Sequence, residues 1–302
     1  MFQPFTGLYE PSGIRQLPDG RFLVVEDEKN HPFSLATISA RGIVSSTPLL
    51  PPKQEGADSA WKLDDLEALA LDRAGYIYAL TSHSRDARGK EKKSRNKLLR
   101  FRIAGERMVD PELITGLKPA LAAAHPLLAA AAEITDVKSQ GGLNIEAMEI
   151  SADGRQLLIG FRSPVSNDRA IIARVGNAAA VFEADEPPCI EATLVTLELG
   201  GQGIRALAHI PALDGYLLAS GPVARKHVQF QLWFWSGRPE EPARLVSVAG
   251  LPGFEHAEGI SPALIDGRQH VIIVSDDGSR EARRYARFLL IELDQLLIAP
   301  PR

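Results

Sequence analysis

The sequence predicts an all-β fold, a β-propeller of five blades, on the basis of two observations. First, an apolar strand, a turn containing Asp or Gly and a second apolar strand recur five times. The glycines of these turns are Gly20, Gly75, Gly154, Gly215 and Gly267. Second, their separations are 55, 79, 61 and 52 residues, and the interval from the last across the termini to the first is again 55. Hairpin repeats of roughly 50 residues are typical of propellers, and a closed ring requires a final interval of this length.

Each interval has room for four strands. In the first interval, turn residues separate the candidates Ile14–Leu17, Phe22–Glu26, Ser34–Ser39 and Ile43–Leu49. The fifth blade offers only three candidates, near Ile260, over Val271–Val274 and over Phe288–Leu293. We therefore expect Phe2–Leu8 to supply its fourth strand, which would leave no open sheet edge between the first and last blades. Residues 1–302 would then form a single β-propeller domain.

The long second interval contains an alanine-rich segment, Pro119–Glu133. High alanine content favours a helix, and Pro126 would break or restart it. We expect a helical insertion over about residues 119–135, which either packs on a blade or covers one face of the ring. A degenerate sixth blade hidden in this interval is the alternative.

The composition excludes several classes of protein. The 302 residues carry a formal net charge of −4, which argues against a general nucleic-acid binder. Cys189 is the single cysteine, so an intrachain disulfide and a cysteine-based metal cluster are excluded. No apolar run is long enough for a membrane span, and the N-terminus has no signal-peptide pattern. These features predict a cytoplasmic protein. An exported protein whose leader has been removed would show the same sequence features.

The first position of each inner strand is polar in all five repeats. Across the blades it reads Ser12, Glu67, Glu146, Arg205 and Glu258. Inner strands line the channel of a propeller, so three carboxylates and one guanidinium are expected to face a common axis. A partly buried carboxylate needs a cation, hydrogen bonds or a proton. The set predicts either a structural belt of ion pairs or direct contact with a ligand.

A second polar set lies where each second strand ends, at the same face of the ring. Its acidic residues from the two blades that meet at the closure are Glu26, Asp27, Asp276 and Asp277, of which Asp27, Asp276 and Asp277 are the candidate metal ligands. Hard oxygen ligands of this kind suit Ca²⁺ or Mg²⁺. The groups expected opposite them are His83, Arg162 and Arg205, which would suit a phosphate or carboxylate. The basic stretch Arg85–Lys97 in blade 2 reads either as a solvated loop or as a flap that attracts an anion.

The third repeat carries a family resemblance. It reads GLNIEAMEI over residues 142–150 and QLLIGFRSP over residues 156–164, and resembles the bacterial DUF3616 family. The similarity extends from Glu10–Gly13 to Arg287–Glu292. The strand starts Glu-Ala and Glu-Gly are also similar to those of esterase-like phytase and SdiA-regulated propellers. The resemblance implies a propeller and, for DUF3616, a protein of unknown function; the dense acidic clusters of propeller phytases are not evident.

Three functional hypotheses follow. The first is a binding protein that holds a small anionic molecule or a partner protein at the channel, without nucleic acid or membrane. Its expected ligand-binding residues are Glu67, His83, Glu146, Arg162, Arg205 and Glu258. The second is a divalent-metal-dependent hydrolase of phosphate esters or related esters, in which Glu146 is the general base. The third is a scaffold for protein interactions.

Overall fold

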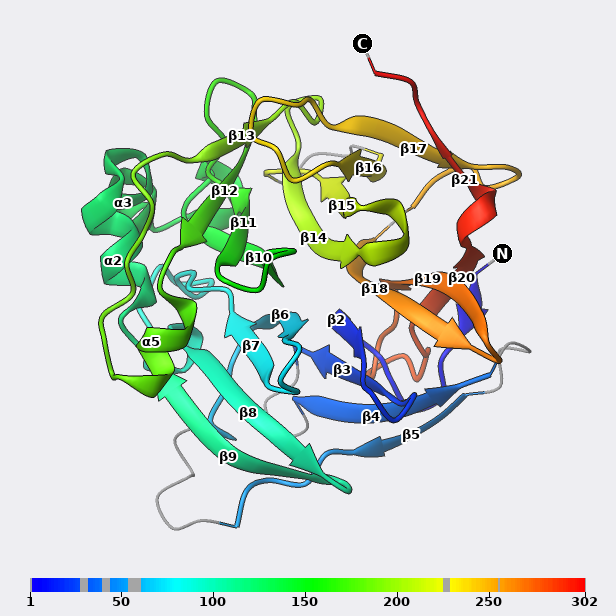
Figure 1. Cartoon of the computed structure of the whole chain (residues 1–302). Helices are drawn as coiled ribbons and strands as arrows, with labels where there is room; N and C mark the ends of the chain where they lie inside the picture. Colours follow the sequence, from blue (N-terminus) through cyan, green and yellow to red (C-terminus); the bar gives the residue numbers. More distant parts are fainter. Residues whose placement is uncertain are drawn as a thin grey trace.

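The computed structural model describes residues 2–27, 32–39, 44–53, 61–224, 229–254 and 256–301. Five antiparallel sheets form the blades of a ring around a central channel (Figure 1). This arrangement confirms the predicted five-bladed β-propeller. The described part of the interval from Gly75 to Gly154 contains helices and no sixth sheet.

In each blade the inner strand is followed outward by the other strands in hydrogen-bonded order. Blade 1 consists of β2 (Pro11–Gln16), β3 (Phe22–Glu26), β4 (Phe33–Ile38) and β5 (Val44–Pro48). Blade 2 consists of β6 (Leu66–Leu71), β7 (Ile77–Thr81), β8 (Leu98–Ala104) and β9 (Arg107–Ile114). Blade 3 consists of β10 (Asn144–Ile150), β11 (Leu157–Ser163), β12 (Ala170–Val175) and β13 (Val195–Leu197). Blade 4 begins with β14 (Gly203–Ile210), β15 (Gly215–Gly221), β16 (Gln231–Trp235) and β17 (Arg244–Val248). Blade 5 contains β18 (Ala257–Ile265), β19 (Arg268–Ser275) and β20 (Arg287–Glu292). Ile43, where we expected the fourth strand of blade 1 to start, lies outside the described residues.

The N-terminal segment closes blade 5, as predicted. Strand β1 (Gln3–Pro4) pairs with β20 and is the outermost strand of that sheet. Beyond it, the backbone N–H of Phe5 donates to Ala286 (2.8 Å), and the N–H of Ala286 donates to Leu8 (3.0 Å). The Phe5 ring is buried, with its centroid 4.7 Å from that of Phe288. The regular strand is shorter than expected, but its contacts extend over the predicted range.

The C-terminal segment adds a strand that the repeat pattern did not predict. Strand β21 (Leu296–Ile298) follows a short 3-10 helix, η3 (Leu293–Gln295), and pairs with β17 at the outer edge of blade 4. Blade 4 therefore has five strands. The N-terminal and C-terminal segments thus each add an outermost strand, to blade 5 and blade 4 respectively, which are neighbours in the ring (Figure 1).

The alanine-rich segment is helical and interrupted as predicted. Helix α2 (Leu117–Ala124) ends before α3 (Pro126–Glu133), and Pro126 is the first residue of the second helix. Leu117 and Leu121 of α2 and Leu128 of α3 pack against the core between blades 2 and 3, at the rim of the ring (Figure 1). The short helix α4 (Val137–Gln140) follows and leads into β10. A further helix, α5 (Ala178–Glu183), lies between β12 and β13. None of the helices in the described ranges has the length and apolar character of a membrane span.

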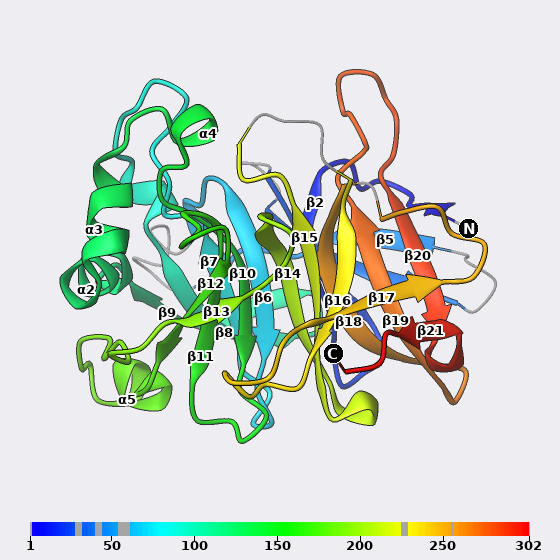
Figure 2. The same ribbon diagram turned by 90° about the horizontal axis from the view of Figure 1, so that it is seen from above.

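The channel is closed in its middle by apolar side chains, one from each inner strand. These residues are Ile14, Leu69, Met148, Leu207 and Ile260. The free volume at this level is about 10 Å³, no more than the space that a single water molecule needs. This constriction divides the channel into two mouths. Figure 2 views the ring from the side, with α4 at one end. We call the mouth beside α4, where the inner strands begin, the upper mouth, and the opposite one the lower mouth.

Candidate functional site

A β-bulge interrupts every inner strand at the same place. In each blade one residue of the inner strand is skipped in the pairing with the second strand. The five skipped residues are Ser12, Glu67, Glu146, Arg205 and Glu258. A bulge re-aims the side chain of its extra residue, and all five line the upper mouth. The recurring polar position in the sequence is thus a recurring bulge that presents one side chain per blade to the channel.

The bulge residues form the floor of a cavity of about 300 Å³. Its wall comes from the ends of second strands, from the loop after β7 and from the segment that contains α4. The ionisable wall residues are Asp27, Asp65, Arg85, Asp86, Arg95, Asp136, Lys138, Arg162 and Asp276. With the floor residues, the described part of the cavity collects eight carboxyl groups and five cationic groups. Carboxyl groups therefore outnumber cations at the upper mouth.

Glu146 is the centre of the ion pairs on the cavity floor. Its Oε1 accepts hydrogen bonds from Arg162 (3.0 Å) and from the amide of Asn144 (2.8 Å). Its Oε2 lies 2.8 Å from Nε of Arg205, which also pairs with Glu258. These groups are buried or nearly so, and each charge has an opposite partner. The network joins blades 3, 4 and 5.

Arg162 owes its position to a close approach of two backbones. The chain enters blade 4 at Gly203, where a Cβ atom would lie 1.9 Å from the carbonyl oxygen of Arg162. Only glycine fits that approach. The Arg162 side chain then donates from Nε to the carbonyl of Pro222 (3.0 Å) and from Nη1 to Glu146.

Glu67 occupies the equivalent position in blade 2 but makes no hydrogen bond or ion pair with any described residue. Burial, together with repulsion from the carboxylates of Glu146, Asp65 and Asp27, raises its pKa well above the usual value. A carboxyl group in this setting retains its proton at pH values where an exposed glutamate has lost it. The cavity therefore contains one paired and one unpaired glutamate at equivalent positions of adjacent blades.

Two aspartates at the closure also face the cavity. Burial and repulsion from Asp65 raise the pKa of Asp27 to about 7, and the N–H of Asp65 donates to its Oδ1 (3.1 Å). Burial and repulsion from Glu10 raise the pKa of Asp276 to about 6. Asp276 makes no side-chain hydrogen bond or ion pair with a described residue. Like Glu67, these carboxyl groups have no ion pair with a cation among the described residues.

Two residues expected at the site do not line the cavity. His83 is fully buried in a left-handed backbone conformation (φ 55°), and its Nδ1 bonds to the carbonyl of Thr81 (2.7 Å). Burial lowers the pKa of His83 to about 4. Asp277 turns toward β20, where one oxygen pairs with the Arg287 guanidinium and the other accepts the Arg287 N–H (3.1 Å). Among the described residues, no three His, Cys, Asp or Glu side chains are placed to hold one metal ion.

The structure adds a polar group that the sequence reasoning missed. Oδ2 of Asp65 accepts hydrogen bonds from Ser84 (3.1 Å), from Ser82 and from the guanidinium of Arg95 (2.8 Å). Asp65 lies two residues before Glu67, and this proximity was the available signal. The basic stretch that contains Arg95 is held in place, since Arg85 donates to the carbonyl of Ala132 (3.0 Å).

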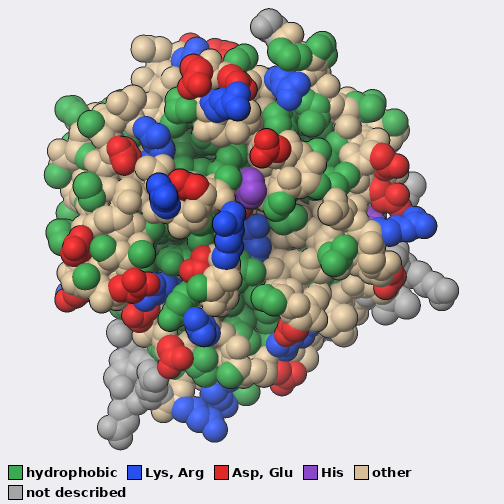
Figure 3. Space-filling view, in the orientation of Figure 1, with side chains coloured by type: hydrophobic (Ala, Val, Ile, Leu, Met, Phe, Trp, Pro, Cys, Tyr) green, Lys and Arg blue, Asp and Glu red, His purple; other side chains and the backbone are tan. Residues whose placement is uncertain are grey.

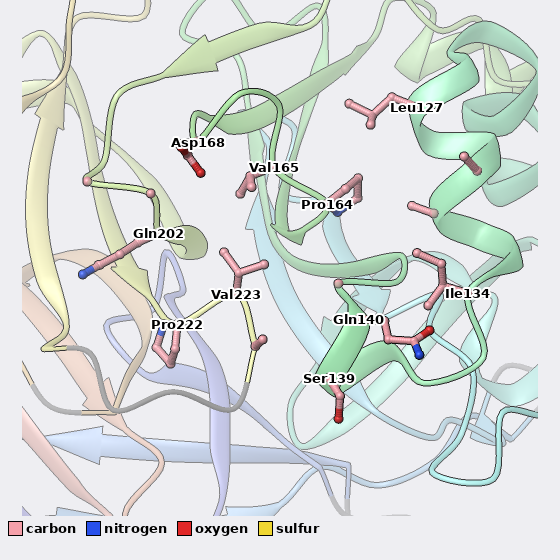
Figure 4. A pocket seen from close by; sticks show the side chains of 16 residues that line it. Leu127, Ile134, Ser139, Gln140, Pro164, Val165, Asp168, Gln202, Pro222 and Val223 are labelled. Atoms are coloured by element: carbon pink, nitrogen blue, oxygen red, sulfur yellow. The ribbon is translucent and has the colours of Figure 1, made fainter.

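A second hollow lies beside this cavity, between α3 and the loops of blades 3 and 4 (Figure 4). Its volume is about 660 Å³. Apolar side chains such as Leu127, Ile134 and Val223 line it, and Asp168 is its one ionisable residue among those described. It has far fewer charged groups than the 300 Å³ cavity, where thirteen described ionisable side chains converge. The 300 Å³ cavity is therefore the candidate functional site.

Comparisons with solved structures find propeller-like chains of low sequence identity. A putative oxidoreductase (glucose dehydrogenase) from Thermus thermophilus has 16% identity and a TM-score of 0.47, covering 96% of this chain and 99% of that one. The PQQ-bound aldose sugar dehydrogenase of Streptomyces coelicolor has 13% identity and a TM-score of 0.44, with coverages of 96% and 98%. A gluconolactonase from Xanthomonas campestris has 12% identity and a TM-score of 0.44, with coverages of 99% and 86%. Similarities at this level carry no argument about activity.

The sequence comparisons are more specific. No functionally curated protein matches the chain. The DUF3616 family, described as proteins of unknown function, matches residues 107–291, which is more than half of the sequence. The match includes the third repeat, on which the resemblance was based, and three of the five bulge residues, Glu146, Arg205 and Glu258. The chain therefore belongs to the DUF3616 family.

Proposed function

We propose that the protein binds a small polar molecule at the upper mouth and that the cavity receives a positively charged group of this ligand. One observation carries the proposal: Glu67, Asp27 and Asp276 face the cavity with raised pKa values and without an ion pair to a described cation. Ionised carboxylates that are partly withdrawn from water are stabilised by a nearby positive charge. A ligand cation would supply that charge.

The ligand differs in charge from the anion expected from the sequence, because the two arginines expected to bind that anion, Arg205 on the cavity floor and Arg162 in its wall, are already paired. Arg205 is shared between Glu146 and Glu258, and Arg162 is bonded to Glu146. An anion would have to compete with these carboxylates. The cavity volume of about 300 Å³ lies at the lower end of the range for small-molecule sites, which favours a compact ligand.

A pair of matched probes tests the sign of the ligand charge. Putrescine and succinate have the same four-carbon length but carry two ammonium and two carboxylate groups, respectively. We expect calorimetric titration to detect putrescine and no comparable binding of succinate. Glu67→Gln should weaken putrescine binding about tenfold, the magnitude of losing one charge-assisted contact. Glu281→Gln, at an exposed position outside the cavity, is the matched control.

The opposite preference would reject the proposed ligand charge. Succinate binding that is lost in Arg162→Gln would support the anionic ligand instead. Binding of neither probe, with no change in thermal unfolding, would favour the scaffold hypothesis.

Hydrolysis is a second candidate function, favoured by the contrast between Glu67 and Glu146. Two carboxyl groups whose surroundings differ in this way can divide the roles of general acid and general base. Glu67 would donate a proton to a leaving group, while Glu146, held by two arginines, would orient a water molecule. Turnover of nitrophenyl ester or phosphate ester probes that is lost in both Glu67→Gln and Glu146→Gln would support this function over simple binding.

A further inference from the structure

The lower mouth contains a separate hollow of about 700 Å³. It is lined by the ends of inner strands and by the turns that follow them, on the side of the ring opposite α4. Figure 3 shows this side of the molecule, where acidic and basic side chains and a histidine gather near the middle. The apolar layer of the channel separates this hollow from the upper mouth.

Arg15 is a buried cation with unused hydrogen-bonding capacity. Its side chain lines the hollow and is only 7% exposed, and it pairs with Glu149 across the ring, from blade 1 to blade 3. A guanidinium has five N–H donors. The contact to Glu149 uses Nη2, and Nε is buried without a partner among the described residues. The remaining N–H groups of Arg15 make no other hydrogen bond to a described residue.

The three carboxylates around this hollow, in contrast, each accept at least two hydrogen bonds from the protein. Glu149 accepts from Arg15, from the N–H of Ile150 (2.8 Å) and from the N–H of His209 (2.8 Å). Asp72 accepts from the N–H of Tyr76 (2.8 Å) and the hydroxyl of Tyr78 (3.3 Å). Asp153 accepts from the hydroxyl of Ser151 (2.5 Å) and the N–H of Arg155 (3.1 Å).

His209 and Arg73 add two more donors at the edge of the hollow. The His209 ring lies 5.1 Å from the Tyr216 ring, centroid to centroid, and makes no hydrogen bond to a described residue. Its pKa is lowered mainly by burial, with repulsion from Arg15 and Arg73 opposing the attraction of Glu149 and Asp214. Arg73 donates one hydrogen bond to the carbonyl of Ala152 (2.8 Å), and its side chain is exposed.

We propose that the lower mouth binds a small oxyanion, a carboxylate or phosphate group, between Arg15, Arg73 and His209. Donor groups of Arg15, Arg73 and His209 remain without partners among the described residues, and they complement a ligand that brings acceptors. Two guanidinium groups favour an ionised acceptor over a neutral one. This site is independent of the ligand at the upper mouth.

Inorganic phosphate and acetate test the proposal through the titration of His209. An anion bound beside the ring stabilises its charged form, so NMR of the histidine rings should show the pKa of His209 rising by roughly 0.5 units. The rise should saturate with added anion at constant ionic strength maintained with chloride. A response to phosphate alone would indicate a site specific for phosphate. A response to both anions would indicate a site that accepts carboxylates and phosphates alike. His125 is the internal reference, because its imidazole bonds to the carbonyl of Glu191 in another part of the propeller.

Two exposed arginines give matched variants. Arg73→Gln should abolish most of the rise, while Arg155→Gln, on a neighbouring turn but outside the hollow, should leave it intact. An unchanged His209 titration in wild-type protein would overturn the proposal. An equal response in chloride alone, or equal losses in both variants, would also overturn it by showing only general screening. None of these outcomes depends on ligand binding at the upper mouth.

Discussion

Glu67 and Glu146 occupy the same bulge position in adjacent blades, yet only Glu146 is bonded to arginine among the described residues. The difference arises from the neighbouring blades. Glu146 has Arg205 of blade 4 beside it, whereas Glu67 lies between Ser12 of blade 1 and Glu146 itself. A common backbone geometry thus presents two carboxyl groups with opposite electrostatic surroundings. This asymmetry is the main functional feature of the upper mouth.

The first prediction concerns the pH dependence of stability. The pKa of Glu67 is raised on folding, so the folded state holds a proton that the unfolded chain releases above about pH 4.5. Glu67 must therefore lower stability as pH rises through this range. We expect Glu67→Gln to gain about 1 kcal/mol or more relative to wild type between pH 5 and pH 8. Urea unfolding at both pH values measures this difference.

The control for this prediction is Glu281→Gln, which should follow wild type at both pH values. A constant difference between Glu67→Gln and wild type would show that Glu67 ionises normally in the folded protein.

The second prediction concerns the ion pairs on the cavity floor. Arg205→Met would leave two buried carboxylates, Glu146 and Glu258, without their shared partner. Breaking a buried pair in this way costs about 3–5 kcal/mol. Arg162→Met should cost less, about 1–2 kcal/mol, because Glu146 retains Arg205. Equal and small losses in chemical denaturation would show that the network contributes little to the stability of blades 3 to 5.

The third prediction concerns the closure of the ring. Removal of residues 1–9 deletes β1 together with the buried side chains of Phe5 and Leu8. We expect a sharp fall in melting temperature, and Phe5→Ala alone should cost about 3–5 kcal/mol. Leu297→Ala in β21 is the control, since its side chain is 56% exposed and should cost little. Unchanged melting after the deletion would mean that blade 5 is stable without its outer strand.

The architecture could be predicted from the sequence because the same residue types recur in the turn between the first two strands of each blade. Gly20, Gly75, Gly154 and Gly267 all have φ values between 76° and 88°, a region that side chains disfavour, so glycine recurs there. In the fourth turn, Asp214 takes the left-handed position instead (φ 48°). The inner-strand positions were predictable for a related reason, since the bulge recurs with the repeat.

The second polar set converged only in part. Asp27, Arg162 and Asp276 line the cavity, whereas the left-handed backbone at His83 turns its ring inward and Arg287 holds Asp277 away. The backbone conformation at His83 and the pairing of Asp277 do not recur from blade to blade. A pattern of five repeats could therefore not indicate them. Strand β21 was missed for the same reason, because its three residues pair with the preceding blade and have no counterpart in the repeat.

The last prediction concerns divalent metal. Of the three aspartates expected to bind Ca²⁺ or Mg²⁺, Asp277 spends both oxygens on Arg287, leaving Asp27 and Asp276. Ca²⁺ takes six to eight oxygen ligands, and two carboxylates from the described residues are a weak starting set. We therefore expect EDTA to leave the melting temperature unchanged. If EDTA lowers it and either ion alone restores it, a metal binds the folded protein. Loss of this restoration in Asp276→Asn would then place the ion in the cavity. Loss of it in Asp277→Asn instead would place the ion outside the cavity, at the closure of the ring.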